Sequence, residues 1–223
     1  MPNDAAEMLV PDNAPWFQDR QGAKSGLAVD LVSLLAARSG LPLDVEGVPL
    51  ARIASLLPVE RSGRFAIFAR PESLPDHLVQ LGGTFEMPLL AIARDSEPPP
   101  TLDRLRQLGR VGLVHGAARL LPAEFVRGIA FEEMPDIPAG LKMLDVGRID
   151  AMLLSKIEAE LITEARKSQF HLGAAVQVET LHVALVASSS TAASAEAQTL
   201  EAAWNACLSD GSIERMLAAR GRD

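Results

Sequence analysis

Short apolar runs alternate with helix-like segments along most of this chain, and this alternation restricts its fold more than any other feature. Apolar runs at residues 8–10, 65–69 and 111–114 have the length of buried strands. The segment after the first run has Leu27, Leu31, Leu34 and Leu35 on one helical face and ends at Gly40. Strands that alternate with helices predict an α/β fold with mainly parallel sheets and helices on both faces.

The predicted element order restarts after a breaker, DSEPPP, at residues 95–100. Before it we expect the order β-α-β-α-β, and after it β-α-α-β-α-β followed by two terminal helices. Expected strands cover residues 8–10, 41–48, 64–69, 86–94, 110–114, 148–154, 170–178 and 180–188. Expected helices cover residues 27–39, 49–63 (cut short by Pro58), 102–109, 136–147, 155–168, 195–211 and 212–221, and residues 115–125 are expected to form a turn that leads into a helix.

The composition excludes several classes of protein. With 223 residues, 48% of them hydrophobic, the chain can form one large domain or two small lobes. A net charge of -8, the lack of any basic run and 4% aromatic residues argue against nucleic-acid binding. The single cysteine, Cys207, permits no disulfide within the chain, and the four histidines lack metal-ligand spacing. We therefore expect no metal and no cofactor.

The first sixteen residues, MPNDAAEMLVPDNAPW, have neither the positive nor the apolar region of a signal peptide, and no later stretch reaches membrane-spanning length. These observations leave two alternatives open, a cytosolic protein or an exported protein without its leader.

Five stretches in order resemble the family 3 extracellular solute-binding proteins, the polar amino-acid binders of ABC importers. PWFQDRQGAKSGLAVDLVSLLAARSG is similar to the family's opening, with a Pro-aromatic turn at Pro15 and a Gly-x-x-x-Asp-Leu motif from Gly26. The other four stretches are VPLARIASLLPVERSGRFAIFA, RVGLVHGAARLL, LKMLDVGRIDAMLL and LSDGSIERMLAARG. They are spread from residue 15 to residue 221, so the resemblance extends over nearly the whole chain.

The resemblance implies the two-lobed periplasmic-binding-protein fold of type II, with two hinge strands and a ligand cleft between the lobes. Lobe one would comprise residues 5–90 plus 183–223, and lobe two residues 91–182. The hinge would be LLAIAR and TLHVALV, and the breaker falls just after the first of these crossings. Such lobes close around ligands by hinge motion. The resemblance also implies a periplasmic location, and we expect a monomer.

Two positions depart from the family's usual ligand site. The family's Thr-Pro-Glu-Arg loop, whose Arg clamps the ligand's α-carboxylate, corresponds here to Arg70-Pro71-Glu72-Ser73, so that Ser73 occupies the clamp position. Arg70 or His77 could substitute for the missing cation. The family's Asp for the ligand's α-ammonium corresponds to Ser155. A site that lacks both the cation and the anion would bind a zwitterionic amino acid poorly.

The loop VHGAAR resembles the family's second ligand loop but lacks its Thr or Ser. Gly116 allows close backbone approach, and the amides of Ala117 and Ala118 can receive an anion. We also predict ligand contacts from Asp12, Asn13, Trp16, Phe17, Arg52, Ala69 and His115. The alternatives are turn formation for Asp12 and Asn13, core packing for the aromatic residues, and salt bridges or solvation for the arginines.

Three functions follow as hypotheses. The first is a non-enzymatic binder of a small polar or anionic solute, partnered by an ABC transporter permease. The second is a sensory or interaction module of the same fold, partnered by another periplasmic protein. The third is an enzyme similar to cyclohexadienyl dehydratases, which share the fold and need an acid or base in the cleft. No catalytic motif pairs Glu72, His77 or His115, so we expect no enzyme.

Overall fold

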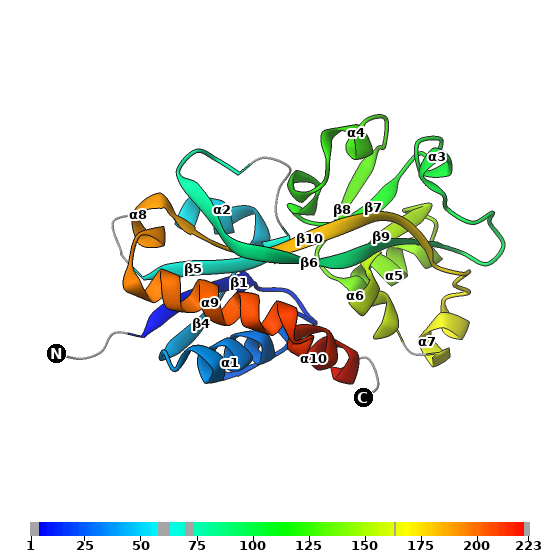
Figure 1. The fold of residues 1–223 in the computed structure, drawn as a ribbon. Helices are drawn as coiled ribbons and strands as arrows, with labels where there is room; N and C mark the ends of the chain where they lie inside the picture. The colour runs from blue at the N-terminus through cyan, green and yellow to red at the C-terminus, as the bar shows by residue number, and fades with distance from the viewer. Residues whose placement is uncertain (1–4, 58–62, 70–73, 163, 221–223) are drawn as a thin grey trace. The chain divides into compact units, whose positions relative to one another are not determined.

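The structure is a computed structural model that describes residues 5–57, 63–69, 74–162 and 164–220. The chain divides into two compact units (Figure 1). Unit 1 comprises Met1–Phe85 and His182–Asp223, and unit 2 comprises Glu86–Leu181. Two long strands, β6 (Leu78–Ala93) and β10 (Val176–Ser188), each pass from one unit to the other. β6 contains LLAIA of the segment LLAIAR and β10 contains TLHVALV, and their role as a hinge stays a prediction.

The sheet of unit 1 has β1 (Ala6–Pro11) at its centre. β1 is parallel to β4 (Leu43–Val48) and to β5 (Arg64–Ala69), and β5 pairs antiparallel with the second half of β10. Residues Met8–Val10 of β1 are fully buried. A strand that is buried on both faces reads as a continuous apolar run, which is the pattern seen in the sequence. A short hairpin, β2 (Gln18–Arg20) and β3 (Ala23–Ser25), was not predicted.

Helix α1 (Leu27–Ser39) forms where the leucine spacing predicts it. Leu27, Leu31 and Leu35 are buried, and Gly40 ends the helix with a φ of 73° while its amide donates to the Ala36 carbonyl. Within unit 1, α1 lies beside α9 (Ala195–Ser209) and α10 (Ser212–Arg220), as Figure 1 shows. The remaining helices of this unit are short: η1 (Leu50–Arg52), α2 (Ile53–Leu56) and α8 (Ser189–Ala192).

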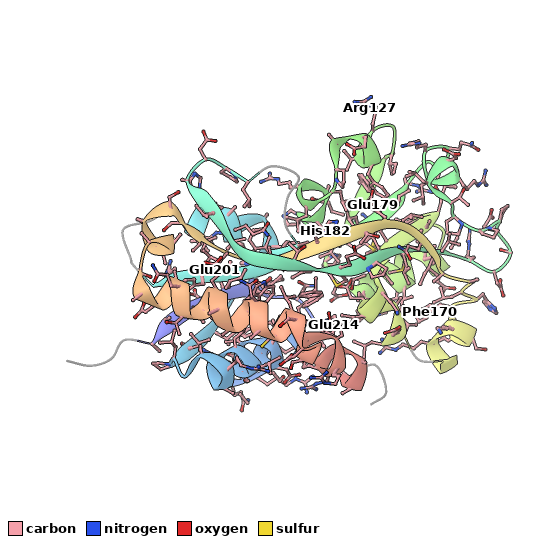
Figure 2. All side chains as sticks on the ribbon, in the orientation of Figure 1. Arg127, Phe170, Glu179, His182, Glu201 and Glu214 are labelled. Atoms are coloured by element: carbon pink, nitrogen blue, oxygen red, sulfur yellow. The ribbon has the colours of Figure 1, made fainter. Side chains whose placement is uncertain are left out.

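Helix α9 fixes the start of β6. Gly82 has a φ of 68°, and its amide donates to Glu201 Oε1 over 3.0 Å; Figure 2 labels Glu201 on α9. Asn205 Oδ1 accepts the amide of Gly83 over 2.9 Å. The indole Nε1 of Trp204, which is fully buried, donates to the Gly83 carbonyl over 2.7 Å. Polar groups from two adjacent turns of α9 thus satisfy the backbone of Gly82 and Gly83 near the start of β6.

Unit 2 repeats this plan with β7 (Val111–Val114) at the centre of its parallel strands. β7 is parallel to β8 (Phe131–Met134) and to β9 (Ala151–Ser155), and β9 pairs antiparallel with β6. Residues of the strands alternate between two cores: Leu153 joins Leu105 and Phe125, and Met152 joins Leu141 and Leu144. The helices of unit 2 are α3 (Leu102–Leu105), η2 (Ala117–Leu120), α4 (Ala123–Val126), α5 (Ile137–Asp145), α6 (Lys156–Glu160) and α7 (Glu164–Gln169).

Four sequence-based expectations are corrected by the structure. Strand β8 was missed because its sequence, FEEM, has no clear alternation, and its pairing with β7 forms it. The helix expected over 155–168 breaks into α6 and α7, and Ile162 beyond the end of α6 is buried in the core. The two strands expected over 170–188 are one strand that begins at Val176. The helix expected from residue 49 and cut short by Pro58 is divided between η1 and α2, and residues 58–62 lie outside the described part.

Candidate functional site

Each unit has three parallel strands of which the first in the chain is central. The strand order is β4-β1-β5 in unit 1 and β8-β7-β9 in unit 2. The chain leaves the central strand toward one neighbour and later reaches the other, so the loops at their carboxyl ends diverge. Ligands of open α/β sheets bind at such a switch point. The candidate site in unit 1 is therefore formed by the loops after β1, β4 and β5, and in unit 2 by those after β7 and β9.

The loop after β1 turns on the carbonyl of Asn13. The amides of Trp16 and Phe17 donate to this carbonyl over 2.8 and 3.0 Å. The loop then passes against Gly26, where a Cβ atom would lie 2.4 Å from the Trp16 carbonyl oxygen, and the Ala28 amide donates to that same oxygen. Only glycine fits here for two reasons. A side chain would meet this oxygen, and Gly26 has a φ of 126°, which favours glycine. The glycine of the predicted Gly-x-x-x-Asp-Leu motif thus positions the aromatic turn.

The two predicted aromatic residues have different surroundings. Phe17 is 8% exposed, and its ring lies on the backbone of Gly47 in β4, where an added Cβ would be 2.3 Å from a ring carbon. Phe17 therefore packs on the sheet of unit 1, in agreement with the packing alternative. Trp16 is half-buried and keeps part of its surface accessible in the loop.

Two opposite charges stand at the carboxyl ends of β1 and β4. Asp12 follows Pro11, and Arg52 lies in η1 after Val48; Pro11 and Val48 are paired in the sheet. Both side chains are exposed. Within the described residues, neither the Asp12 carboxylate nor the Arg52 guanidinium has a hydrogen bond or an ion pair, so both can receive a ligand. The amide of Asp12 donates to the Val48 carbonyl and holds the two loops together.

The loop after β5 is described only in part. Ala69 is the last residue of β5, is half-buried and pairs with Val183. Arg70, Glu72 and Ser73 lie outside the described residues. His77 is exposed, and its carbonyl accepts the Ser189 amide over 2.9 Å.

In unit 2 the loop after β7 presents backbone donors. Gly116 has a φ of 80° and leads into η2. In the part of the chain that the structure describes, the amides of Gly116, Ala117 and Ala118 donate no hydrogen bond. His115, beside them, has Nδ1 2.6 Å from Glu133 Oε2 at the end of β8, and its amide donates to the Met134 carbonyl. His115 is thus held by a carboxylate of the neighbouring strand.

Arg119 is a candidate residue that the sequence reasoning missed. It lies on η2 directly after Ala118, is exposed, and its guanidinium has no partner among the described residues. The signal was available, since a cation follows the predicted amide donors in the stretch VHGAAR. Free amides and a free guanidinium on one loop favour an anionic group.

Ser155 ends β9 and begins α6, and its side chain is engaged within unit 2. It is 4% exposed, its hydroxyl donates to Glu158 Oε2 over 2.8 Å, and its amide donates to the same oxygen over 2.7 Å. In return, the Glu158 amide donates to the Ser155 hydroxyl, which completes a capping box. Lys156 is 3.7 Å from Glu160. The hydroxyl of Ser155 is therefore committed to the helix cap.

A groove of about 640 Å³ in unit 2 adjoins the carboxyl end of β9. Its walls combine apolar side chains of β6 with charged side chains of α6 and α7, so it suits a partly polar occupant. It is lined by Pro88, Leu90, Ile92, Lys156, Ala159, Glu160, Lys167, Leu172, Gly173, Ala174, Ala175 and Gln177.

The described residues contain neither a candidate metal site nor a helix that could span a membrane. No three side chains of His, Cys, Asp or Glu gather there in a way that could hold a metal ion. Among the same residues, no helix combines the length and the apolar character that crossing a membrane requires.

Comparison with known proteins identifies the fold. No protein-family model matches the sequence, and no curated protein sequence matches it. Among solved structures, a histidine kinase sensor domain with similarity to periplasmic binding proteins matches with a TM-score of 0.76 and 17% identity, over 97% of this chain and 96% of that one. An ancestral arginine-binding protein bound to arginine matches with a TM-score of 0.74 and 13% identity, over 96% and 97%.

A third similar structure is the VFT2 domain of Bordetella pertussis BvgS, in a double mutant, with a TM-score of 0.70 and 18% identity over 96% of this chain and 92% of that one. These similarities extend over almost the full length of each chain. The chain therefore has the α/β fold of the periplasmic binding proteins, as the resemblance in the sequence implied.

Proposed function

We propose that this chain is a non-enzymatic module that binds a small polar or anionic molecule through the loops at the carboxyl ends of its parallel strands. The observation that carries the proposal is the unpaired polar groups on these loops. Unit 2 offers the amides of Gly116–Ala118 and the guanidinium of Arg119, and unit 1 offers Asp12 and Arg52. Unpartnered donors at a switch point are what a bound ligand would satisfy.

The ligand class follows from the charges. The donors in unit 2 match a carboxylate or a phosphate better than a neutral group, because hydrogen bonds to ionised acceptors are stronger. At the position where an amino-acid binder would hold the α-ammonium, Ser155 is engaged with Glu158. We therefore propose an anionic or polar solute before a standard zwitterionic amino acid.

A sensory role is the second candidate function. It is favoured by the structural similarity to a histidine kinase sensor domain, although at 17% identity the likeness concerns the fold. In this role the two units would act as ligand-binding lobes attached to a signalling partner. In the first role the partner would be the permease of an ABC importer in the periplasm.

The binding proposal is tested by thermal denaturation against a panel of amino acids, dicarboxylates, polyamines and small anions, followed by calorimetry on the compounds that stabilise. A ligand at a hundredfold its Kd adds about 2.7 kcal/mol, which raises the midpoint of a chain of this size by roughly 5–10 °C. Arg119→Ala should weaken the binding of such a ligand about tenfold or more.

Arg127→Ala is the matched control, since Arg127 is another exposed arginine of unit 2 and lies outside the candidate site. If no compound in the panel stabilised the protein, the small-molecule proposal would be refuted and the interaction module would remain. Binding that Arg119→Ala and Arg127→Ala affect equally would refute the assignment of the loop after β7. Capture of a permease by the ligand-bound protein would favour transport over sensing.

A further inference from the structure

A polar pocket lies at the edge of unit 2's sheet opposite to the candidate site. Its volume is about 250 Å³. Because β6 runs antiparallel to β9, its carboxyl end meets the amino end of β9, with Ala93 paired to Ala151. Arg94 follows Ala93 and lines this pocket together with Glu97, Arg104, Gln107 and Asp150. The pocket is therefore separate from the loops after β7 and β9, which lie at the other end of these strands.

The backbone around Arg94 is fixed on both sides. Arg94 forms an isolated bridge with Leu172, and the amide of Asp95 donates to the His171 carbonyl over 2.7 Å. The Arg94 carbonyl accepts the Glu97 amide over 3.0 Å. These contacts place the start of the arginine side chain, which lines the pocket, in a defined position.

Among the described residues, the guanidinium of Arg94 has no hydrogen-bond or ion-pair partner. Its Nε atom is buried and has no hydrogen-bond partner, and no ion pair of Arg94 occurs among the described residues. The acids of the pocket have partners other than Arg94: Glu97 lies 3.8 Å from Arg104 of the same pocket, and Asp150 Oδ2 accepts the Arg110 amide over 2.9 Å. A buried donor of a charged group without an acceptor is costly, and such groups are rarely left unsatisfied.

We propose that this pocket binds a small oxyanion, a carboxylate or phosphate group, on the guanidinium of Arg94. The planar fork of arginine matches the two oxygens of either group. Gln107 and Arg104 supply further donors in the lining. The volume lies just below the range of about 300–1,000 Å³ that drug-sized ligands occupy, so the occupant is a small anion. This site stands independently of the function proposed above.

Titration calorimetry with inorganic phosphate and with malonate, at constant ionic strength in chloride, tests the site. The wild-type protein should bind at least one of the two saturably, and the stronger of them distinguishes a phosphate from a carboxylate ligand. Arg94→Met should weaken this binding about 10- to 100-fold, because it removes hydrogen bonds to a charged group. Arg127→Met is the control, since Arg127 is exposed at the end of α4 and projects from unit 2 in Figure 2. It should bind like the wild type.

Two further readouts separate this site from the candidate site and from a structural role. Hydrogen exchange of the wild-type protein should slow on anion binding at residues 93–97 and 104–109; this measurement stands even if Arg94→Met does not fold. In chloride alone, Arg94→Met should melt no lower than the wild type, because it removes a half-buried cation whose Nε atom is buried without a partner among the described residues. The proposal is overturned by the absence of saturable binding, by unchanged binding in Arg94→Met, or by protection confined to residues 115–119.

Discussion

Ser155→Ala removes the hydroxyl on which the capping box of α6 depends, and we expect it to destabilise unit 2. In the wild type this hydroxyl donates to the Glu158 carboxylate over 2.8 Å and accepts the Glu158 amide over 3.3 Å. Both residues are less than 10% exposed, with Ser155 at 4% and Glu158 at 8%. Water therefore cannot readily replace the missing group, and the carboxylate loses one of its donors.

The magnitude follows from the two bonds. A hydrogen bond to a charged group contributes about 1.5–3 kcal/mol, and an N-cap hydroxyl typically about 1 kcal/mol. The Ser155 amide still donates to Glu158, so the carboxylate is not left alone. We expect a loss of about 2–4 kcal/mol in the free energy of unfolding, which is roughly 5–15 °C in Tm for a chain of this length.

The assay is urea unfolding followed by two probes. Both tryptophans, Trp16 and Trp204, lie in unit 1, so their fluorescence reports that unit. Hydrogen exchange at residues 151–160 reports unit 2. Thr101→Ala is the matched control in unit 2, because Thr101 is an exposed N-cap with a single bond of 3.4 Å to the Arg104 amide. It should cost only about 0.5–1 kcal/mol.

Equal losses in Ser155→Ala and Thr101→Ala would refute the reasoning, since they would show that burial and the reciprocal bond from Glu158 add nothing. A loss below about 0.5 kcal/mol in Ser155→Ala would refute it as well. Ser155→Thr, which keeps the hydroxyl, should retain most of the cap and separates this bond from the effect of changing the side chain.

Three other predictions concern unit 1. Gly26→Ala should cost at least about 2 kcal/mol in thermal or urea unfolding, because the new Cβ would meet the Trp16 carbonyl at 2.4 Å with φ at 126°; a neutral effect would contradict the role of this glycine. Hydrogen bonds from Ser212 and then from Arg38 lower the pKa of Asp210 to about 2, below its ordinary 3.8, so its contribution to stability is complete above pH 4 and is lost as the pH falls toward 2. The difference in Tm between the wild type and Asp210→Asn should therefore shrink over pH 4 to 2, and a difference that grew there would refute the assignment. Trp204→Phe should lose about 1–3 kcal/mol by urea unfolding, because it removes the 2.7 Å bond to the Gly83 carbonyl, and a stabilised variant would show that this carbonyl is satisfied in another way.

Strong local signals made much of the fold predictable. Thr101 and Asp136 cap α3 and α5 as their positions in the sequence indicate, and Gly40 and Gly147 have the positive φ expected of residues that follow a helix. The strands β1, β5, β7 and β9 are buried apolar runs that local pattern identifies. Strand β8 has no such pattern, because as an edge strand it owes its conformation to its partner β7.

The candidate site was predictable in outline and not in chemistry. The motif around VHGAAR indicated backbone donors, and the structure adds the free Arg119 beside them. Ser155 was expected at a ligand position, and its engagement with Glu158 depends on the turn from β9 into α6. Arg70 and Ser73 stay a prediction, since they lie outside the described residues.

By itself, the sequence determined most of the segments that become helices and strands, because periodicity, caps and glycines act over a few residues. It also determined the α/β class, since alternation of the two elements leaves few other ways to bury them. Only the tertiary structure decided which polar groups have partners. Arg94 and Asp150 are far apart in the chain and meet at one edge of a sheet, where one stays unpaired and the other binds the Arg110 amide. Pairing of this kind depends on distances across strands, which no local pattern contains.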